Sequence, residues 1–160
     1  MDYHKALAYL NEMQEMHGKL TLENIQKIID NLPFEINGIT FIQVAGTNGK
    51  GSTAHFLTSI LQAAGKKTGL FTSPHLQDIR ERITIDKTWI SQEDFALCLS
   101  RIKEISEELL RKKSIANMPT FFEHLFLLSL YYFSRERVDY AVLEVGLGGR
   151  LDATSTIKPA

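Results

Sequence analysis

Over the first thirty residues, apolar side chains recur every three or four positions along the chain. The first of these positions are Ala6, Leu7, Leu10 and Met13. The spacing predicts one amphipathic helix from Asp2 to His17 and, after Gly18, a second helix that Thr21 caps. Because the second pattern stops near Pro33, we expect residues 1–32 to form a helical lead-in to the rest of the chain.

From residue 39 the pattern changes to short apolar runs. The run ITFIQVA is rich in β-branched residues and is typical of a strand buried on both faces. A glycine-rich loop and a helix from about Gly51 to Ala64 follow it. KKTGLFT predicts a second strand, SPHLQDIRER a polar loop, and RITIDKTWIS two short strands joined at Asp86 and Lys87.

The second half of the chain carries two helical patterns and a third core strand. Ser91 is placed to cap a helix with one apolar stripe, and TFFEHLFLLSLYYFSRE predicts a helix buried on most sides. VDYAVLEV predicts a strand, and GLGGRLDATSTIKPA a loop. This order predicts a P-loop-type, three-layer α/β fold with a mainly parallel sheet over residues 39–160. The sheet would end after its third core strand with an open edge, so we expect a truncated domain.

Composition narrows the class of protein. The 160 residues suffice for one domain with a core, and 44% apolar residues, 23% charged residues and a net charge of −1 are typical of soluble globular proteins. A near-neutral charge disfavours nucleic acid as a partner. There is neither an apolar run of membrane-spanning length nor a signal peptide, which disfavours a membrane. The single cysteine, Cys98, excludes an internal disulfide and favours the cytoplasm.

The segment FIQVAGTNGKGSTAHFLTSIL, from Phe41 to Leu61, has the parts of a phosphate-binding loop. Such a loop needs glycines that turn backbone N–H groups inward, a lysine, a hydroxyl for Mg²⁺ and a following helix. The strict pattern fails, because Val44 replaces its first glycine and Gly51 replaces its first hydroxyl. A strand, a lysine and a helix in the right order still predict a phosphate site rather than a plain turn. Its residues are Gly46, Thr47, Asn48, Gly49, Lys50, Gly51 and Ser52.

Two residues at strand ends are candidate partners of a metal-bound nucleotide. Glu144 ends VDYAVLEV, where a Walker-B acid would lie, and Ser73 follows GLFT. The carboxyl ends of parallel strands converge on one crevice, and an acid in an apolar strand is costly unless it is paired. The alternatives are a strand end that reaches solvent for Glu144 and an ordinary loop residue for Ser73. The five histidines show no metal-ligand spacing, and Leu151 breaks the match of GLGGRLDAT to a dinucleotide-binding fingerprint.

Several separated blocks resemble the folylpolyglutamate synthase/dihydrofolate synthase family, which is related to the Mur peptide ligases. The blocks are VAGTNGKGSTAHFLTSILQAAGKKTGLFTSPHL, RERI, PTFFEHLF and LEVGLGGRLDATS. They extend from about Asn31 to Pro159. In this family the loop carries glycine after its lysine and the hydroxyl one place later, at Ser52. The resemblance covers less than half of a complete member, so a glutamate-binding C-terminal domain would be absent and this chain by itself inactive.

The resemblance implies ATP-dependent amide ligation, with ATP and Mg²⁺ as cofactors. A carboxylate of a folate or of dihydropteroate would attack the γ-phosphate of ATP, and the amine of L-glutamate would displace phosphate from the acyl phosphate. Lys50 and the loop would hold the phosphates. Ser52 and Glu144 would hold one Mg²⁺, and Ser73 and Glu144 would contribute to a second. The resemblance places the substrate against two segments and one arginine. These residues are Thr120, Phe121, Phe122 and Glu123, then Leu151, Asp152 and Ala153, and Arg82.

Alternatives remain open at this point. Phe121 and Phe122 could be plain helix core, and Arg82 could lie on the surface. The chemistry could be that of a Mur-type peptide ligase, of a P-loop kinase or NTPase, or of a fragment that binds nucleotide without catalysis. We expect the parent protein to be a monomer. The open sheet edge predicts that this chain by itself self-associates.

Overall fold

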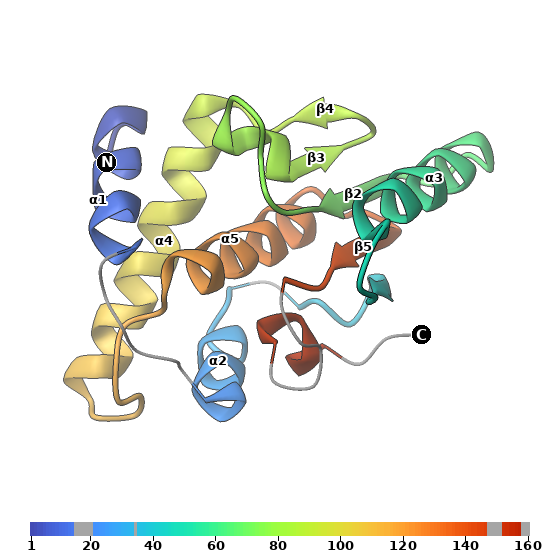
Figure 1. Cartoon of the computed structure of the whole chain (residues 1–160). Coiled ribbons are helices and arrows are strands. Elements are labelled where there is room, and N and C mark those ends of the chain that lie inside the picture. The colour runs from blue at the N-terminus through green and yellow to red at the C-terminus, as the bar shows by residue number, and fades with distance from the viewer. Residues whose placement is uncertain (15–20, 34, 147–151, 158–160) are drawn as a thin grey trace.

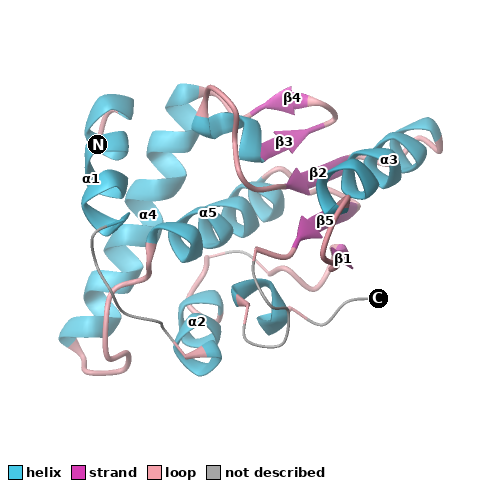
Figure 2. Cartoon of the chain, viewed as in Figure 1, coloured by secondary structure: helices cyan, strands magenta, loops and turns pink. Residues whose placement is uncertain are grey.

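Five strands form one mixed sheet in the order β1-β5-β2-β3-β4 (Figure 2). The computed structural model describes residues 1–14, 21–33, 35–146 and 152–157. The strands are β1 (Thr40–Val44), β2 (Thr68–Phe71), β3 (Ile83–Ile85), β4 (Thr88–Trp89) and β5 (Tyr140–Glu144). β5 pairs in parallel with both β1 and β2, whereas β3 and β4 continue the sheet as an antiparallel hairpin. The predicted mainly parallel α/β fold is confirmed.

Helices cover both faces of this sheet (Figure 1). α3 (Lys50–Ala63) packs on β1, β2 and β5, and α5 (Phe121–Arg135) packs on β2 from the other side. α4 (Gln92–Arg111) lies against α5 and forms, with α1 (Tyr3–Gln14), an outer layer. α2 (Leu22–Ile29) contacts α4 and the short 3₁₀ helix η2 (Ala153–Thr156). The larger core lies on the α5 side, and a small cluster of four buried residues lies under α3.

Local chemistry sets the ends of these elements. The predicted caps Thr21 and Ser91 each accept a backbone N–H at the start of a helix, and Thr120, whose cap was not predicted, does the same for α5. Asp86 and Lys87 join β3 to β4 with positive φ angles of 49° and 66°. Two consecutive residues of positive φ match the right-handed twist of a two-residue hairpin turn.

β1 lies at an edge of the described sheet, yet it buries Phe41 in the larger core and Val44 in the cluster under α3, so both faces of the strand contribute to a core, as predicted. Thr40, Ile42 and Gln43 are half-buried. Two other expectations need correction. The supposed polar loop SPHLQDIRER contains the 3₁₀ helix η1 (Ile79–Arg82), and the last predicted loop contains η2. The helix predicted from Asp2 to His17 is present over Tyr3–Gln14, and its predicted end lies outside the described residues. No described helix combines the length and the apolar character that crossing a membrane requires.

Candidate nucleotide and metal site

The carboxyl ends of β1, β5 and β2 meet at one edge of the sheet. In the register of the parallel pairs, Val44 lies opposite Glu144, and Phe71 lies opposite Leu143. The end of β5 therefore lies between the glycine loop that follows β1 and the loop at Ser73 that follows β2. This is the crevice in which open α/β sheets bind ligands.

The glycine loop leads directly into α3, which begins at Lys50. Its N-cap, Gly49, has φ 74° and ψ 7°, a left-handed conformation that glycine adopts without a Cβ penalty. No side chain caps the helix, and its first turn carries no acidic residue. The first N–H groups of α3, at Lys50 to Ser52, thus carry positive partial charge where a phosphate would lie.

Gly51, which stands where the common phosphate-loop pattern has a hydroxyl residue, lies close to Glu144. A Cβ placed on Gly51 would lie 3.7 Å from Oε2 and 3.8 Å from Oε1 of Glu144. The first turn of α3 therefore packs closely against this carboxylate, and a larger side chain at position 51 would point at it. Ser52, the next residue, is exposed.

Glu144 is a buried acid, with 5% of the residue exposed. Its Oε2 accepts a 3.0 Å hydrogen bond from the backbone N–H of Ser73, and it forms no ion pair with any described residue. A buried carboxylate without a cation is costly, and a hard cation with oxygen ligands such as Mg²⁺ would compensate it. Across the described ranges, no three His, Cys, Asp or Glu side chains cluster as metal ligands. An ion here would need hydroxyl, phosphate and water oxygens as well.

The two predicted substrate segments meet beside Gly146. A Cβ on Gly146 would lie 2.7 Å from the ring of Phe122 and 3.0 Å from Oδ2 of Asp152, and the Gly146 N–H donates to the same Oδ2 at 3.1 Å. Phe122 in turn packs against Phe71, with ring centroids 5.6 Å apart. The structure thus brings the start of α5 and the Asp152 segment together. Leu151 lies outside the described residues.

Several predicted substrate residues have structural duties of their own. Thr120 and Glu123 form a capping box, in which the Thr120 N–H donates to Glu123 Oε2 at 2.7 Å. Asp152 accepts from the N–H and the hydroxyl of Thr154 at 3.0 and 2.7 Å, and Ala153 is buried. These hydrogen bonds hold both segments in place. Their contact with a substrate stays a prediction.

Arg82 is buried, so the surface alternative was wrong. Only 9% of the residue is exposed, and its Nε donates to Nδ1 of His75 at 2.8 Å. Its guanidinium carbon lies 5.4 Å from the ring centre of Phe121, a cation–π distance. Burial lowers the pKa of Arg82, and burial together with the Arg82 charge lowers the pKa of His75. Arg82 therefore lies beside a predicted substrate residue.

Two hydrogen-bonded contacts were not predicted from the sequence. The side-chain amide of Gln43 donates to Thr154 Oγ1 at 2.7 Å and ties β1 to η2. Glu81 accepts backbone N–H groups of Leu76, Gln77 and Asp78 at 2.8–2.9 Å and fixes the loop after Ser73. A polar residue within ITFIQVA signals the first link, and the Asp-x-x-Glu spacing of a capping box signals the second.

Comparisons with known proteins agree with this geometry. No family model matches the chain. A probable bifunctional folylpolyglutamate synthase/dihydropteroate synthase of Haloferax volcanii is 40% identical over 159 residues, which are 99% of this chain and 19% of that protein. The folylpolyglutamate synthase structure from Thermotoga maritima matches with TM-score 0.86 and 38% identity, over 98% of this chain and 36% of that one. The chain belongs to the folylpolyglutamate synthase/dihydrofolate synthase family.

Two further structures of this family come from solved complexes. E. coli FolC, in complex with DHPP and ADP, matches with TM-score 0.86 and 32% identity, over 99% of this chain and 36% of that one. A second complex is the bifunctional folylpolyglutamate synthase/dihydrofolate synthase of Yersinia pestis with AMPPNP and Mn ion. It matches with TM-score 0.86 and 32% identity, over 99% of this chain and 37% of that one. The present family member thus spans between about a fifth and two fifths of its relatives' length.

Proposed function

We propose that this chain supplies the nucleotide- and Mg²⁺-binding part of an ATP-dependent ligase, which joins L-glutamate to a folate or dihydropteroate carboxylate through an acyl phosphate. The observation that carries the proposal is the buried Glu144, which has no cationic partner among the described residues and lies against the first turn of α3. Family membership supports it, because related structures hold ADP, AMPPNP, Mn and DHPP.

The glycine loop would hold the phosphates of ATP. The N–H groups at the start of α3 face the position of an anion, and Lys50 would add a full positive charge next to them. In phosphoryl transfer, positioning and charge neutralisation supply most of the rate enhancement. Lys50 is half-buried and makes no ion pair with the described residues, so its ammonium group is available for a phosphate.

Glu144 would hold Mg²⁺ together with the hydroxyls of Ser52 and Ser73. A bound Mg²⁺ would neutralise the charge of the outer phosphates and of the reacting carboxylate. The Ser73 N–H orients the Glu144 carboxylate from one side, while Gly51 leaves space on the other. No protein nucleophile is required, because the substrate's own carboxylate and amine form the new bonds.

The substrate would lie where α5 begins. Phe121 and Phe122 offer aromatic surface to a flat heterocycle, and Glu123, Asp152 and Ala153 lie in the two segments that approach each other at Gly146. Arg82, fixed between His75 and Phe121, would face an anionic group of the substrate. Because the chain matches only part of its relatives, we propose ligation for the full-length protein and nucleotide binding for this chain.

Calorimetric titration of Mg·ATP into the 160-residue chain tests the nucleotide site. We expect the unsubstituted 160-residue chain, called the parent chain from here on, to bind Mg·ATP, and Lys50→Ala to lose this binding. Lys66→Ala is the matched control, because Lys66 is an exposed lysine two residues beyond the C-cap of the same helix and should leave binding unchanged. Binding that survives in Lys50→Ala, or that is absent from the parent chain, would contradict the proposal.

The proposal also covers the location and the assembly of the protein. We place the protein in the cytoplasm, although a related bovine folylpolyglutamate synthase is mitochondrial. The exposed Phe56 and Ile60 on α3 and the edge strand β1 favour self-association of this chain. Sedimentation that shows a monomer at all concentrations would contradict self-association.

A further inference from the structure

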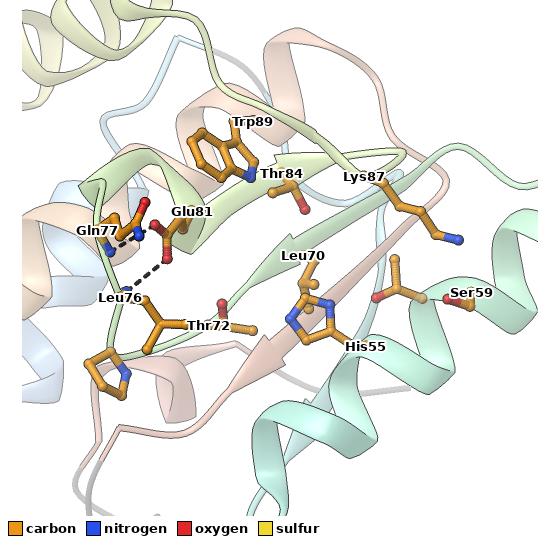
Figure 3. Close-up of a pocket in the computed structure, with 12 residues that line it drawn as sticks. His55, Ser59, Leu70, Thr72, Leu76, Gln77, Glu81, Thr84, Lys87 and Trp89 are labelled. Atoms are coloured by element: carbon orange, nitrogen blue, oxygen red, sulfur yellow. Dashed lines mark hydrogen bonds between the residues drawn. The ribbon is translucent and has the colours of Figure 1, made fainter.

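A pocket of about 530 Å³ lies between α3, the loop after β2 and the β3–β4 hairpin. Figure 3 shows Trp89, Thr84 and Lys87 on the hairpin side and His55 and Ser59 on the α3 side. A pocket of this size suits a small organic ligand. It was not anticipated from the sequence.

This pocket is distinct from the proposed substrate segments. Its floor includes Leu70, which belongs to the small buried cluster with Ala54 of α3. The next residue, Phe71, faces the opposite side of the sheet and contacts Phe122. Since successive strand residues point to opposite faces, the sheet separates the pocket from the start of α5.

The pocket presents large apolar side chains to solvent. Leu76 is 91% exposed and Trp89 is 46% exposed, and both line the pocket together with Pro74 and Leu70. Exposed apolar groups gathered around a hollow are typical of ligand-binding surfaces, because a ligand removes them from water. The aromatic face of Trp89 favours a flat ring over an aliphatic chain.

The charged groups of the pocket indicate the sign of its ligand. Glu81 lines it, but both carboxylate oxygens accept N–H groups of the loop (Figure 3). Asp86, next to Lys87, accepts the Thr68 N–H at 3.0 Å. Lys87 makes no ion pair with the described residues, so it is the cation free to meet a ligand.

The walls are formed before any ligand arrives. Glu81 and Asp78 join in a capping box that fixes the loop, and the positive φ of Lys87 belongs to a tight hairpin turn. A preformed site loses little conformational entropy on binding. We infer that this pocket binds a small planar aromatic molecule with one anionic group, its ring against Trp89 and Leu76 and its anion at Lys87.

The single tryptophan makes the inference directly testable. In a ¹⁵N–¹H correlation spectrum of the 160-residue chain, the indole N–H of Trp89 gives one resonance. Titration with 2-naphthoate should move it saturably, with a Kd at or below about 1 mM for a ligand of this size. The uncharged 2-naphthamide, of the same shape, should bind several-fold more weakly. An unmoved indole resonance, or equal binding of the amide, would overturn the inference.

Variants separate the pocket from non-specific binding. Lys87→Ala should weaken 2-naphthoate about fivefold, as expected for one exposed charge contact, while Lys66→Ala should leave it unchanged. Ser59→Phe, on the α3 wall, should fill the pocket and abolish the indole shift. Dispersed spectra of each variant show that it is folded. Equal affinity of the parent, Lys87→Ala and Ser59→Phe chains would overturn the inference even if the probe binds.

Discussion

The backbone N–H of Ser73 donates a 3.0 Å hydrogen bond to Oε2 of Glu144. The bond joins the loop after β2 to the last residue of β5, and it holds a buried carboxylate that has no ion pair among the described residues. An amide oxygen in the same place could accept the same N–H. A glutamine at position 144 would therefore keep the side chain in place while removing its negative charge.

Glu144→Gln tests the role of that charge. The glutamine oxygen keeps the bond to Ser73 while the buried charge disappears, so the free energy of unfolding should be unchanged or higher. The affinity for ATP in Mg²⁺ should fall at least about tenfold, because a carboxylate ligand is lost. Urea denaturation and calorimetry, with Mg²⁺ or with a chelator, measure the two effects. A variant that binds Mg·ATP like the parent chain contradicts the metal role of Glu144.

Arg82→Gln tests the partly buried contact between Arg82 and His75. Burial lowers the pKa of His75, and the positive charge of Arg82 lowers it further. Removing that charge should raise the pKa of His75 toward the ordinary value of 6.5. The ring resonances of His75, followed by NMR against pH, report the change. Arg101→Gln, which removes an exposed arginine paired with Glu104, should leave the pKa of His75 where it was.

Gly69→Ala tests the packing of α5 on the sheet. A Cβ on Gly69 would lie 2.7–2.9 Å from three ring atoms of Phe133, which is fully buried. Overpacking of this kind should lower the free energy of unfolding by about 1–3 kcal/mol in chemical denaturation. Gly38→Ala is the matched control, because nothing lies within 4 Å of its Cβ position. Equal stability of the two variants would show that Phe133 gives way freely.

Local structure was predictable wherever one side chain determines it. Thr21 and Ser91 mark the starts of α2 and α4, and Asp86 with Lys87 marks the hairpin turn, because caps and turns depend on neighbours in the chain. The convergence of Glu144 and Ser73 was also predictable, since parallel strands end at one edge.

The features that the sequence could not show depend on the order of the strands in the sheet and on which distant elements pack together. In the described sheet β5 lies between β1 and β2, which leaves β1 at the edge and Thr40, Ile42 and Gln43 only half-buried. The sequence left Arg82 open between a substrate contact and the surface, and η1 turns it inward onto His75 and Phe121. The pocket beside Trp89 arises from three elements that periodicity alone does not place together.

His124 gives the fold a predictable dependence on pH. It is fully buried at the first turn of α5, with Nδ1 3.1 Å from the Thr120 carbonyl oxygen and Nε2 2.9 Å from the Tyr9 hydroxyl. A carbonyl oxygen only accepts, so Nδ1 carries the proton and Nε2 accepts from Tyr9. Burial is the main cause that lowers the pKa of His124, from 6.5 to about 4. The folded protein thus holds a neutral imidazole that the unfolded chain protonates more easily.

The unfolded state therefore binds more protons between pH 6.5 and about 4, and the free energy of unfolding rises with pH in that window. The contribution of His124 to the free energy of unfolding is complete above pH 6.5 and is lost as the pH falls to about 4, for a total on the order of 3 kcal/mol.

Urea denaturation at a series of pH values measures this contribution. His124→Gln keeps a polar side chain without a titrating ring, so its stability should fall less steeply over the same window. His4→Gln, at an exposed position on α1, should keep the parent slope. Parallel profiles of the parent and His124→Gln chains would show that carboxylates alone cause the acid sensitivity.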